Sequence, residues 1–540
     1  MSILACEKNG RPHTYRFPWA NFTDLLRTRA REIPDKDALI FCDVDTHARS
    51  SLTYAELETR TATIASALHD RHGIGPGDCV ALALPNAIEI PLLTLSLFRL
   101  GATSVPLDLK RDTPDRKQFK INDSGSRVVC TFNDLLDEEQ CALPESRLVA
   151  TEELDEADPP VPDLEPEWSG TPDLEQHTNV VLYTSGTTGT PKGACLTRQS
   201  LTSNADGIIR WLEFDDTDRL SLVLPLHHVN STVFSLTMLM TGGTLVLNSR
   251  YSLHGFWPVI QEEVVTATSI VPTIMHDLNA SDGPAASDLT HLRKVMIGSA
   301  PVPAGAACRF VDRFGVPLMQ GYGTTEVSLR VTGVPPSLEP ELYRKLLEEN
   351  SIGRELANCN VAIQGEPDEG ELGEILVRGP VIADGYLNQP EATRESFSNG
   401  WFRTGDIGCW KTVGEDRYYF IHGRAKEIII KGGVNISPIA VENAIVESVD
   451  EIAAAYVIGM PSERWGEEIW AVIVYRDGVE PDETLTQSIR ERGLSGEVEG
   501  LSAFEAPNHI VVYDPDDLPK TSTGKVQRSR IRDILVEERG

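Results

Sequence analysis

Short apolar runs alternate with longer segments of helical periodicity along most of the chain. Residues 52–73 place apolar side chains at helical spacing, and Ser51 or Thr53 can cap the start of this segment. Apolar runs of strand length follow, separated by helical stretches. These runs are GDCVALALP, TSVPLDL, SRVVCTF, NVVLYTS, RLSLVLPL, TLVLN, ATSIVP and KVMIGSA. The alternation predicts an α/β fold in which layered, mostly parallel sheets are covered by helices.

The pattern changes after about residue 353. Segments such as GELGEILVRG, GWFRTGDIGCW and RYYFIHGR predict short β elements joined by turns, and a compact α+β pattern follows to the end of the chain. We therefore predict a large N-terminal domain with a β-rich subdomain and a small, mobile C-terminal domain. The predicted boundaries are 1–422 for the large domain, 423–427 for a hinge and 428–540 for the small domain.

Composition fits an ordinary globular protein but gives it a strong negative charge. Of the 540 residues, 41% are hydrophobic and 24% are charged. The 49 Lys and Arg residues are outnumbered by 81 Asp and Glu residues, so the net charge is −32. Such a surface repels nucleic acid and anionic lipid, and we expect neither as a partner. The acidic, Pro-rich segment 152–175 is predicted to be a surface connection.

Targeting signals and cysteine spacing favour a cytoplasmic location. The N-terminal segment MSILACEKNGRPH has no basic region followed by an apolar stretch, so we expect no signal peptide. The apolar run 90–98 is too short to span a membrane and is predicted to be a buried helix. The nine Cys residues form no CxxC pair, which favours reduced thiols over disulfides or zinc.

A glycine- and threonine-rich segment, VVLYTSGTTGTPKGA, spans residues 180–194 after an apolar run. Its glycines let the backbone approach a ligand, and its hydroxyls and N–H groups can hold phosphate oxygens. The predicted phosphate-binding residues are Thr184, Ser185, Gly186, Thr187, Thr188, Gly189 and Lys192. The segment is not a P-loop of the GxxxxGK[ST] type, because Pro191 precedes Lys192 and Gly193 follows it.

The segment YTSGTTGTPKG resembles the phosphate loop of the adenylate-forming superfamily, which includes acyl-CoA synthetases, adenylation domains of peptide synthetases and luciferases. Four further segments resemble the other motifs of this superfamily, in the expected order. They are GYGTTE, WFRTGDIG, GRAKEIIIKGGVNISP and LPKTSTGKVQR. The resemblance covers the chain from about residue 52 to 528, and chance occurrence of all five motifs in this order is implausible.

The resemblance implies the roles of the nucleotide-binding residues. Tyr322 would lie against adenine, Thr325 would bind phosphate, and Glu326 would hold Mg²⁺, a cation that prefers carboxylate oxygen. Asp406 would bind both ribose hydroxyls, and Arg424 would contact ribose or phosphate. The remaining residues of the GYGTTE motif assigned to this site are Gly321, Gly323 and Thr324.

The resemblance also implies a two-step reaction with ATP. The substrate carboxylate attacks the α-phosphorus of ATP, pyrophosphate leaves, and Lys525 with Mg²⁺ offsets the crowded negative charge. A thiol, expected to be that of CoA, then attacks the acyl-AMP and AMP leaves. Between the steps the small domain would rotate about Lys426 and present Gly432 and Gly433, which line the path of the thiol.

The acyl pocket is expected to begin at LPLHHVNSTVF, where His228 matches an aromatic gate of related enzymes. Metal binding by His227 and His228 is not expected, because neighbouring side chains on a strand point to opposite faces. This segment has no Asp that could hold an α-amino group, which favours a plain carboxylic acid substrate. Another wall is assigned to Gly298, Ser299, Ala300 and Gly321. Arg330 is close enough in sequence to meet a second carboxylate of the substrate, although a solvated side chain is the preferred interpretation.

One departure from the resemblance concerns the acceptor. Relatives usually carry a basic residue where LSAFEAPNH has Glu505, so the phosphopantetheine of a carrier protein is the alternative to CoA. Two other classes remain open: an oxidoreductase of the luciferase type and a non-catalytic nucleotide-binding protein. No motif marks oxygen chemistry, and retention of Lys525, Glu326 and Asp406 argues against a non-catalytic protein.

Overall fold

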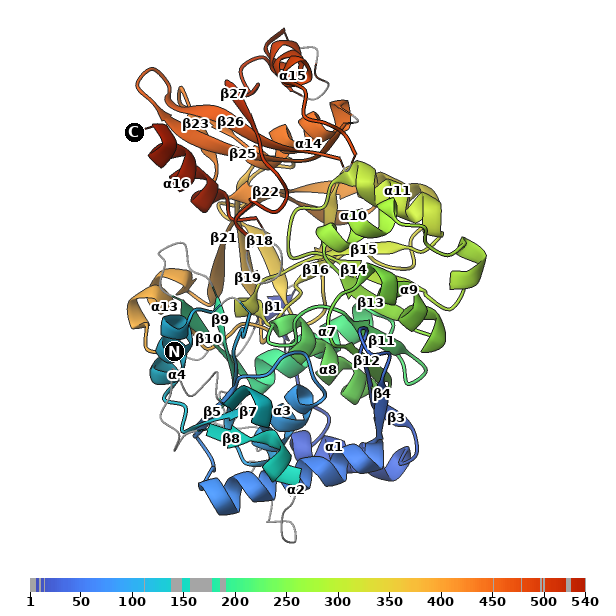
Figure 1. The fold of residues 1–540 in the computed structure, drawn as a ribbon. Coiled ribbons are helices and arrows are strands. Elements are labelled where there is room, and N and C mark those ends of the chain that lie inside the picture. The colour runs from blue at the N-terminus through green and yellow to red at the C-terminus, as the bar shows by residue number, and fades with distance from the viewer. Residues whose placement is uncertain are drawn as a thin grey trace.

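Two layered α/β sheets and a smaller α+β unit make up the described part of the chain (Figure 1). The computed structural model describes residues 6–8, 11–13, 15–110, 112–136, 148–155, 177–184, 191–449, 451–476, 478–495, 498, 501–520 and 526–539. A short N-terminal hairpin pairs β1 (Cys6–Lys8) with β2 (Arg11–His13). The arrangement confirms the predicted fold class.

The first sheet has the strand order β10-β9-β6-β5-β7-β8, and only its β9–β10 pair is antiparallel. Its strands are β5 (Cys79–Leu82), β6 (Thr103–Pro106), β7 (Val128–Thr131), β8 (Leu148–Ala150), β9 (Thr178–Thr184) and β10 (Lys192–Thr197). Helix α2 (Tyr54–His72) leads into β5, α3 (Glu89–Arg99) connects β5 to β6, and α4 (Pro114–Ser124) connects β6 to β7. Helix α3 contains the apolar run 90–98, and all of this run except Thr94 is buried, as predicted.

The second sheet is parallel in one half and antiparallel in the other. Its order is β18-β19-β21-β22-β17-β16-β15-β14-β13-β11-β12-β3-β4. The parallel strands are β3 (Asp37–Cys42), β11 (Arg219–Leu222), β12 (Thr244–Asn248), β13 (Ala267–Ile270), β14 (Lys294–Ile297) and β15 (Leu318–Tyr322). The antiparallel strands are β4 (Arg49–Thr53), β16 (Thr332–Gly333), β17 (Ser351–Glu355), β18 (Asn360–Ile363), β19 (Gly373–Arg378), β20 (Phe397–Ser398), β21 (Trp401–Val413) and β22 (Asp416–Arg424).

Helices pack around this second sheet. They are α1 (Phe22–Glu32), α7 (Arg198–Leu212), α8 (Val229–Thr241), α9 (Leu253–Glu262), α10 (Pro272–Ala280), α11 (Ala304–Phe314), α12 (Pro340–Glu348) and α13 (Pro390–Ser396). The parallel half supplies strand ends at which loops can form a ligand site, and the antiparallel half supplies the β elements predicted after residue 353.

The smaller unit begins after β22 and has its own hydrophobic core. A five-stranded sheet joins β23 (Ile429–Lys431), β24 (Val434–Ile436), β25 (Ile452–Ser462), β26 (Gly466–Tyr475) and β27 (His509–Val512). Helices α14 (Pro438–Ser448), α15 (Glu483–Ser495) and α16 (Arg528–Arg539) pack with this sheet (Figure 1). A separate core is what a unit needs in order to move as one body.

Local signals in the sequence account for the ends of helix α2. The Thr53 hydroxyl accepts a hydrogen bond from the Glu56 N–H, and the Glu56 carboxylate accepts one from the Thr53 N–H. Gly73 ends the helix with a φ of 65°. These contacts satisfy donors and carbonyls that a helix end leaves open. Of the two predicted caps, Thr53 is the one used.

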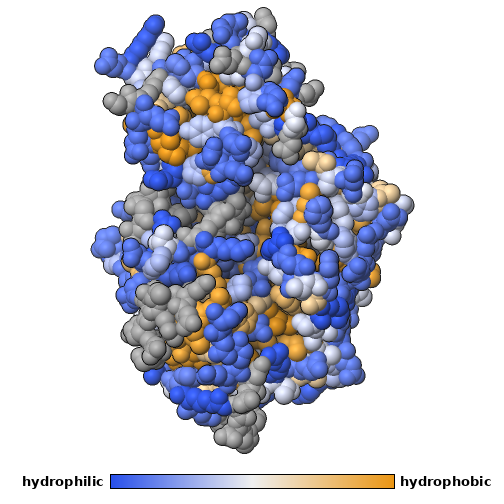
Figure 2. Space-filling view, viewed as in Figure 1, coloured by the Kyte–Doolittle hydropathy of each residue, from blue (hydrophilic) through white to orange (hydrophobic). Residues whose placement is uncertain are grey.

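The face of the molecule in Figure 2 is mainly hydrophilic, and hydrophobic residues gather on its C-terminal unit. In the described residues, no helix combines the length and apolar character needed to cross a membrane. The predicted surface connection at 152–175 starts in a 3₁₀ turn, η3 (Thr151–Asp155), and its remainder lies outside the described residues.

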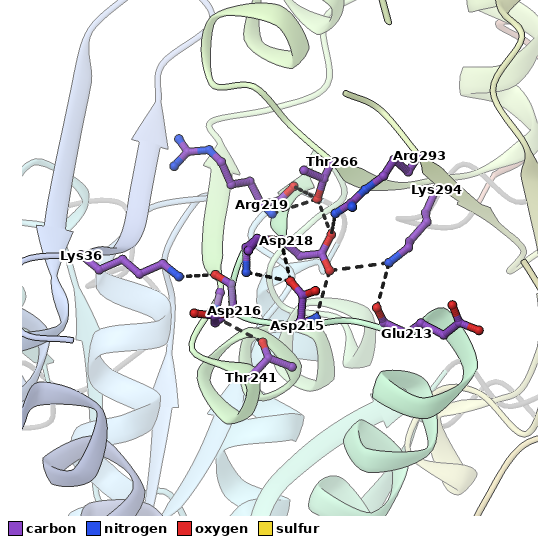
Figure 3. A network of polar contacts seen from close by, with 12 residues as sticks. Lys36, Glu213, Asp215, Asp216, Asp218, Arg219, Thr241, Thr266, Arg293 and Lys294 are labelled. Carbon is purple, nitrogen blue, oxygen red and sulfur yellow. Dashed lines mark hydrogen bonds and ion pairs between the residues drawn. The ribbon is translucent and has the colours of Figure 1, made fainter. Parts of the chain in front are cut away.

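A charged network ties together the amino ends of β11, β13 and β14 (Figure 3). The buried carboxylate of Asp218 accepts hydrogen bonds from the Thr266 hydroxyl at 2.6 Å and the Arg293 guanidinium at 2.7 Å. The ammonium group of Lys294 lies 3.6 Å from its other oxygen. Burial lowers the pKa of Lys294, and the nearby Asp218 carboxylate opposes this effect. The network therefore links the three strands at their amino ends, away from their carboxyl ends.

We expect Asp218→Ala to destabilise the large domain by roughly 3 kcal/mol, because it leaves Lys294 buried without its counter-charge. Urea unfolding followed by tryptophan fluorescence measures the change. Asp216→Ala is the matched control: its side chain is exposed, its bond with Lys36 uses the backbone carbonyl, and we expect a change within about 0.5 kcal/mol. Equal effects of the two substitutions would contradict a stabilising role for the Asp218 network.

Candidate functional site

The predicted phosphate loop leaves and re-enters the first sheet at one point. Thr184 ends β9, Lys192 begins β10, and the two residues are paired across the antiparallel strands. The predicted phosphate-binding residues between them lie outside the described residues: Ser185, Gly186, Thr187, Thr188 and Gly189. The pairing fixes both ends of the loop at the same edge of the sheet.

Lys192 and Glu326 both contact one tyrosine, Tyr386. The ammonium nitrogen of Lys192 lies 4.9 Å from the centre of the Tyr386 ring. The Tyr386 hydroxyl donates a hydrogen bond of 2.9 Å to Oε1 of Glu326. Burial, and then the Glu326 carboxylate, raise the pKa of Tyr386, so this hydroxyl stays a donor. Tyr386 is not among the predicted site residues. In the sequence it is marked only as an aromatic residue in the turn-rich GYLNQP segment.

Glu326 lies in a very tight turn after β15. The turn contains the short 3₁₀ helix η5 (Thr325–Val327), with Thr324 at its start. A Cβ on Gly323 would lie 1.9 Å from the carbonyl oxygen of Leu329, so only glycine fits there. In the described part of the chain Glu326 forms no ion pair, so its charge is available to a cation.

Tyr322, Asp406 and Arg424 come together from three strands. The Tyr322 hydroxyl donates to Oδ2 of Asp406 at 2.6 Å, and Nε of Arg424 lies 2.9 Å from Oδ1. Asp406 on β21 pairs with Arg424 on β22, and Tyr322 ends β15. The Asp406 side chain is 3% exposed, and each carboxylate oxygen can accept more than one hydrogen bond. Burial, and then Asp406, raise the pKa of Tyr322 well above its ordinary value.

Two lines of contact thus converge on the carboxyl end of β15. Tyr322 donates a hydrogen bond to the carboxylate of Asp406. Glu326, four residues later, accepts a hydrogen bond from the hydroxyl of Tyr386. Arg424 feels the negative charge of both Asp406 and Glu326. An arrangement of carboxylates and cations next to a glycine-rich loop is suited to a nucleotide with its metal ion.

The predicted strand geometry at His227 and His228 is wrong. The two residues lie in the turn before α8, and their ring centres are 4.6 Å apart instead of on opposite faces. Strand β11 ends at Leu222, because the run after it contains Pro225 and turns into the helix. Nε2 of His227 lies 3.4 Å from Oδ2 of Asp108. No group of three or more metal-ligating side chains occurs in the described residues.

Helix α8 divides the predicted pocket segment between two faces. Asn230 points to the second sheet and donates to the Ser269 hydroxyl of β13 at 3.0 Å. Ser231, Thr232 and Ser235 instead line a largely apolar cavity between α8, α2 and α3. Asn230 therefore lies on the side of α8 that faces the carboxyl ends of the parallel strands.

The preferred interpretation of Arg330 as a solvated side chain is wrong. The residue is 2% exposed, and its guanidinium lies over Gly298 at the end of β14. After the Glu326 turn the chain returns to β15, where the Val331 N–H donates to the Tyr322 carbonyl, and this return buries Arg330. Gly298 and Gly321, two of the residues assigned to a pocket wall, lie beside Arg330.

The turn at Lys426 connects the two units. Lys426 is exposed between β22 and β23, and the N–H groups of Glu427 and Ile428 both donate to the Arg424 carbonyl. The buried Arg528 binds Glu427 at 3.2 Å and Glu442 of α14 at 2.7 Å. The start of helix α16 is therefore tied to the turn that carries Lys426.

The remaining predicted residues lie in the C-terminal unit. Gly432 and Gly433 form the exposed turn between β23 and β24, with φ values of 58° and 84° that favour glycine. The Glu505 carboxylate accepts hydrogen bonds from the N–H and hydroxyl of Ser502. Lys525 lies outside the described residues, and the flanking residues Lys520 and Val526 are paired.

Comparisons with known proteins agree with this arrangement. A sequence model described as AMP-binding enzyme matches residues 26–387, and one described as AMP-binding enzyme C-terminal domain matches residues 440–525. Feruloyl-CoA synthase of Amycolatopsis sp is 35% identical over 495 residues, which cover 90% of this chain and 94% of the relative. Oxalate–CoA ligase of Arabidopsis thaliana is 32% identical over 531 residues, 95% and 98% of the two chains.

A solved structure is similar over almost the whole chain. It is o-succinylbenzoate CoA synthetase from Bacillus subtilis in complex with its acyl-adenylate intermediate. The TM-score is 0.80 at 28% identity, and the match covers 94% of this chain and 98% of the other.

Proposed function

The chain belongs to the AMP-binding enzyme family, and from that premise we propose that Tyr322, Asp406 and Arg424 hold the nucleotide of an acid-activating reaction. The protein is an AMP-forming acid–thiol ligase. It joins a carboxylic acid to AMP with release of pyrophosphate and then transfers the acyl group to CoA. The observation that carries the assignment of the site is the contact of Asp406 with both Tyr322 and Arg424, because three distant motifs meet there.

In the first step a carboxylate oxygen of the acid attacks the α-phosphorus of ATP, and the bond to pyrophosphate breaks. Thr325 and Lys192 would contact phosphate oxygens, and Lys525 would offset the charge that moves to the leaving group. Asp406 would accept the ribose hydroxyls with its remaining lone pairs. The protein needs no covalent nucleophile, because positioning and charge stabilisation suffice.

The Glu326 carboxylate fits a magnesium ion, since it offers an oxygen donor with no ion-pair partner among the described residues. When bound, magnesium supplies positive charge to the phosphates of ATP. Tyr386 would orient the Glu326 carboxylate through its hydrogen bond, and the ring would hold Lys192 nearby. Tyr386 is thus a positioning residue between the phosphate loop and the metal-binding carboxylate.

For the second step we infer a rotation of the C-terminal unit. Residues 1–422 would stay as one body, 423–427 would act as the hinge, and 428–540 would turn. Lys426 stands in the middle of an exposed turn, which can change its backbone angles at low cost. The turn at Gly432 and Gly433 would then face the thiol.

The acceptor follows from the relatives, which are named for CoA thioesters. The Glu505 carboxylate, which stands where relatives carry a basic residue, is hydrogen-bonded to Ser502 and keeps its negative charge. The phosphopantetheine of a carrier protein therefore stays the alternative acceptor. We also propose a cytoplasmic location, which is consistent with seven cysteines of the described residues lying outside any disulfide.

The reaction class is tested by ATP–pyrophosphate exchange with a panel of fatty, aromatic, dicarboxylic and amino acids. We expect exchange with at least one acid that lacks an α-amino group, and thioester formation when CoA is added. Thioester formation with a carrier protein alone would replace the acceptor. Absence of exchange with every acid would contradict the function, and an oxygen-dependent product would indicate a luciferase-type enzyme.

A further inference from the structure

Arg330 is a buried cation that forms no ion pair within the described part of the chain. It follows the tight turn of Glu326, and its Nη1 donates to the Gly321 carbonyl at 2.9 Å. Its Nε is buried and has no hydrogen-bond partner at any described position. Among the described residues no carboxylate pairs with it, and burial alone lowers its pKa to about 10. A guanidinium keeps its charge even so, and burying it unpaired is costly.

The position of this guanidinium is set by glycines at adjacent strand ends. A Cβ on Gly298, just after β14, would lie 2.4 Å from Nη1 and 2.8 Å from Nη2 of Arg330. A Cβ on Gly321, at the end of β15, would lie 3.3 Å from its Cδ. The two glycines thus make room for the Arg330 side chain at the carboxyl ends of two parallel strands.

A second polar group without a partner lies on α8, against the strand next to β14. Asn230 of α8 donates to Ser269 of β13, yet its buried Oδ1 has no hydrogen-bond partner among the described residues. Strand β13 pairs with β14 and β14 pairs with β15, so the Asn230–Ser269 contact and the Arg330–Gly298 contact stand at neighbouring strand ends. In parallel α/β sheets this edge is where ligands bind.

We propose that Arg330 binds a second anionic group on the acid substrate, a carboxylate or a sulfonate, and so makes this enzyme selective for acids with two negative groups. The inference rests on the proposed function. A planar guanidinium matches either anion with paired hydrogen bonds, and Nε and Nη2 are the donors not used by Gly321.

A purely structural role would leave different traces. If Arg330 served only to bind the Gly321 carbonyl, no charge would be required there. Its loss would then lower kcat/KM to the same degree for every acid. A specificity role affects only the acid that carries the second anion, because its partner guanidinium is removed.

The test compares straight-chain dicarboxylic acids of two to six carbons with monocarboxylic acids of equal length, by ATP–pyrophosphate exchange. A sulfo-substituted acetic acid forms a third arm, which separates sulfonate from carboxylate. We expect wild type to prefer one doubly anionic acid. Arg330→Met should lower kcat/KM for it by roughly 100-fold and change the monocarboxylic acid of equal length little. Arg330→Lys, which keeps the charge but not the planar fork, should retain part of the preference.

Binding of ATP by Arg330→Met, measured by calorimetry, shows that the variant is folded. Equal losses for both series in a variant that binds ATP would overturn the inference. Exchange by wild type with monocarboxylic acids alone would also overturn it and leave the proposed function standing. Exchange with no acid of any arm or of the wider panel would overturn both.

Discussion

Lys525→Ala is expected to lower acyl-adenylate formation by about 10³-fold or more while leaving transfer from supplied acyl-AMP to CoA nearly unchanged. In the first step two anions react and charge moves to pyrophosphate, so loss of an ammonium group there removes direct stabilisation. For the second step the C-terminal unit would have rotated, so the same ammonium group would stand away from the reacting carbonyl and the leaving AMP. Separate assays of the two half-reactions measure the split.

Lys520→Ala is the matched control for this substitution. Lys520 stands at the base of the same loop, paired with Val526, and its ammonium group donates to the Pro515 carbonyl. We expect its loss to change either half-reaction less than about threefold, as for a surface substitution. Similar losses in both half-reactions for Lys525→Ala, or similar effects of the two lysines, would contradict a charge-specific role.

Local chemistry explains why so much of the fold could be predicted. Strand-length apolar runs correspond to β5, β6, β7, β9 and β11 to β14, because a strand buried on both faces needs apolar residues throughout. Thr53 and Gly73 mark the ends of α2 through contacts within a few residues. Such signals do not depend on the rest of the chain.

Contacts between distant segments account for the features that could not be predicted from the sequence. Tyr386 reaches Glu326 only because the segment around residue 386 lies beside β10, where Leu387 donates to the Gly193 carbonyl. The burial of Arg330 likewise depends on the return of the chain from the Glu326 turn to β16. The sequence pattern predicts a strand at His227. The strand instead ends at Leu222, and a proline-containing turn and a helix follow it. None of these outcomes can be read from neighbouring residues.

The residues of the family motifs could be predicted in part. Asp406 and Arg424 are paired across β21 and β22, a register that one sequence does not specify, and Tyr322 comes from another part of the sheet. Their roles were implied by resemblance to a family, and the structure adds their mutual distances. Resemblance thus supplied the correspondence between residues, while the fold supplied the contacts.

Lys426→Pro is expected to preserve adenylate formation and to lower thioester formation by roughly 100-fold. Proline fixes φ and so restricts rotation at the turn, while the hydrogen bonds that close this turn come from the N–H groups of Glu427 and Ile428 and are not removed. Arg528 ties Glu427 to α14 and α16, so a change at this turn moves the base of the Lys525 loop with it. Lys426→Ala removes the charge without fixing φ and should support both half-reactions. An unimpaired second step in Lys426→Pro, or an equal defect in Lys426→Ala, would place the hinge elsewhere.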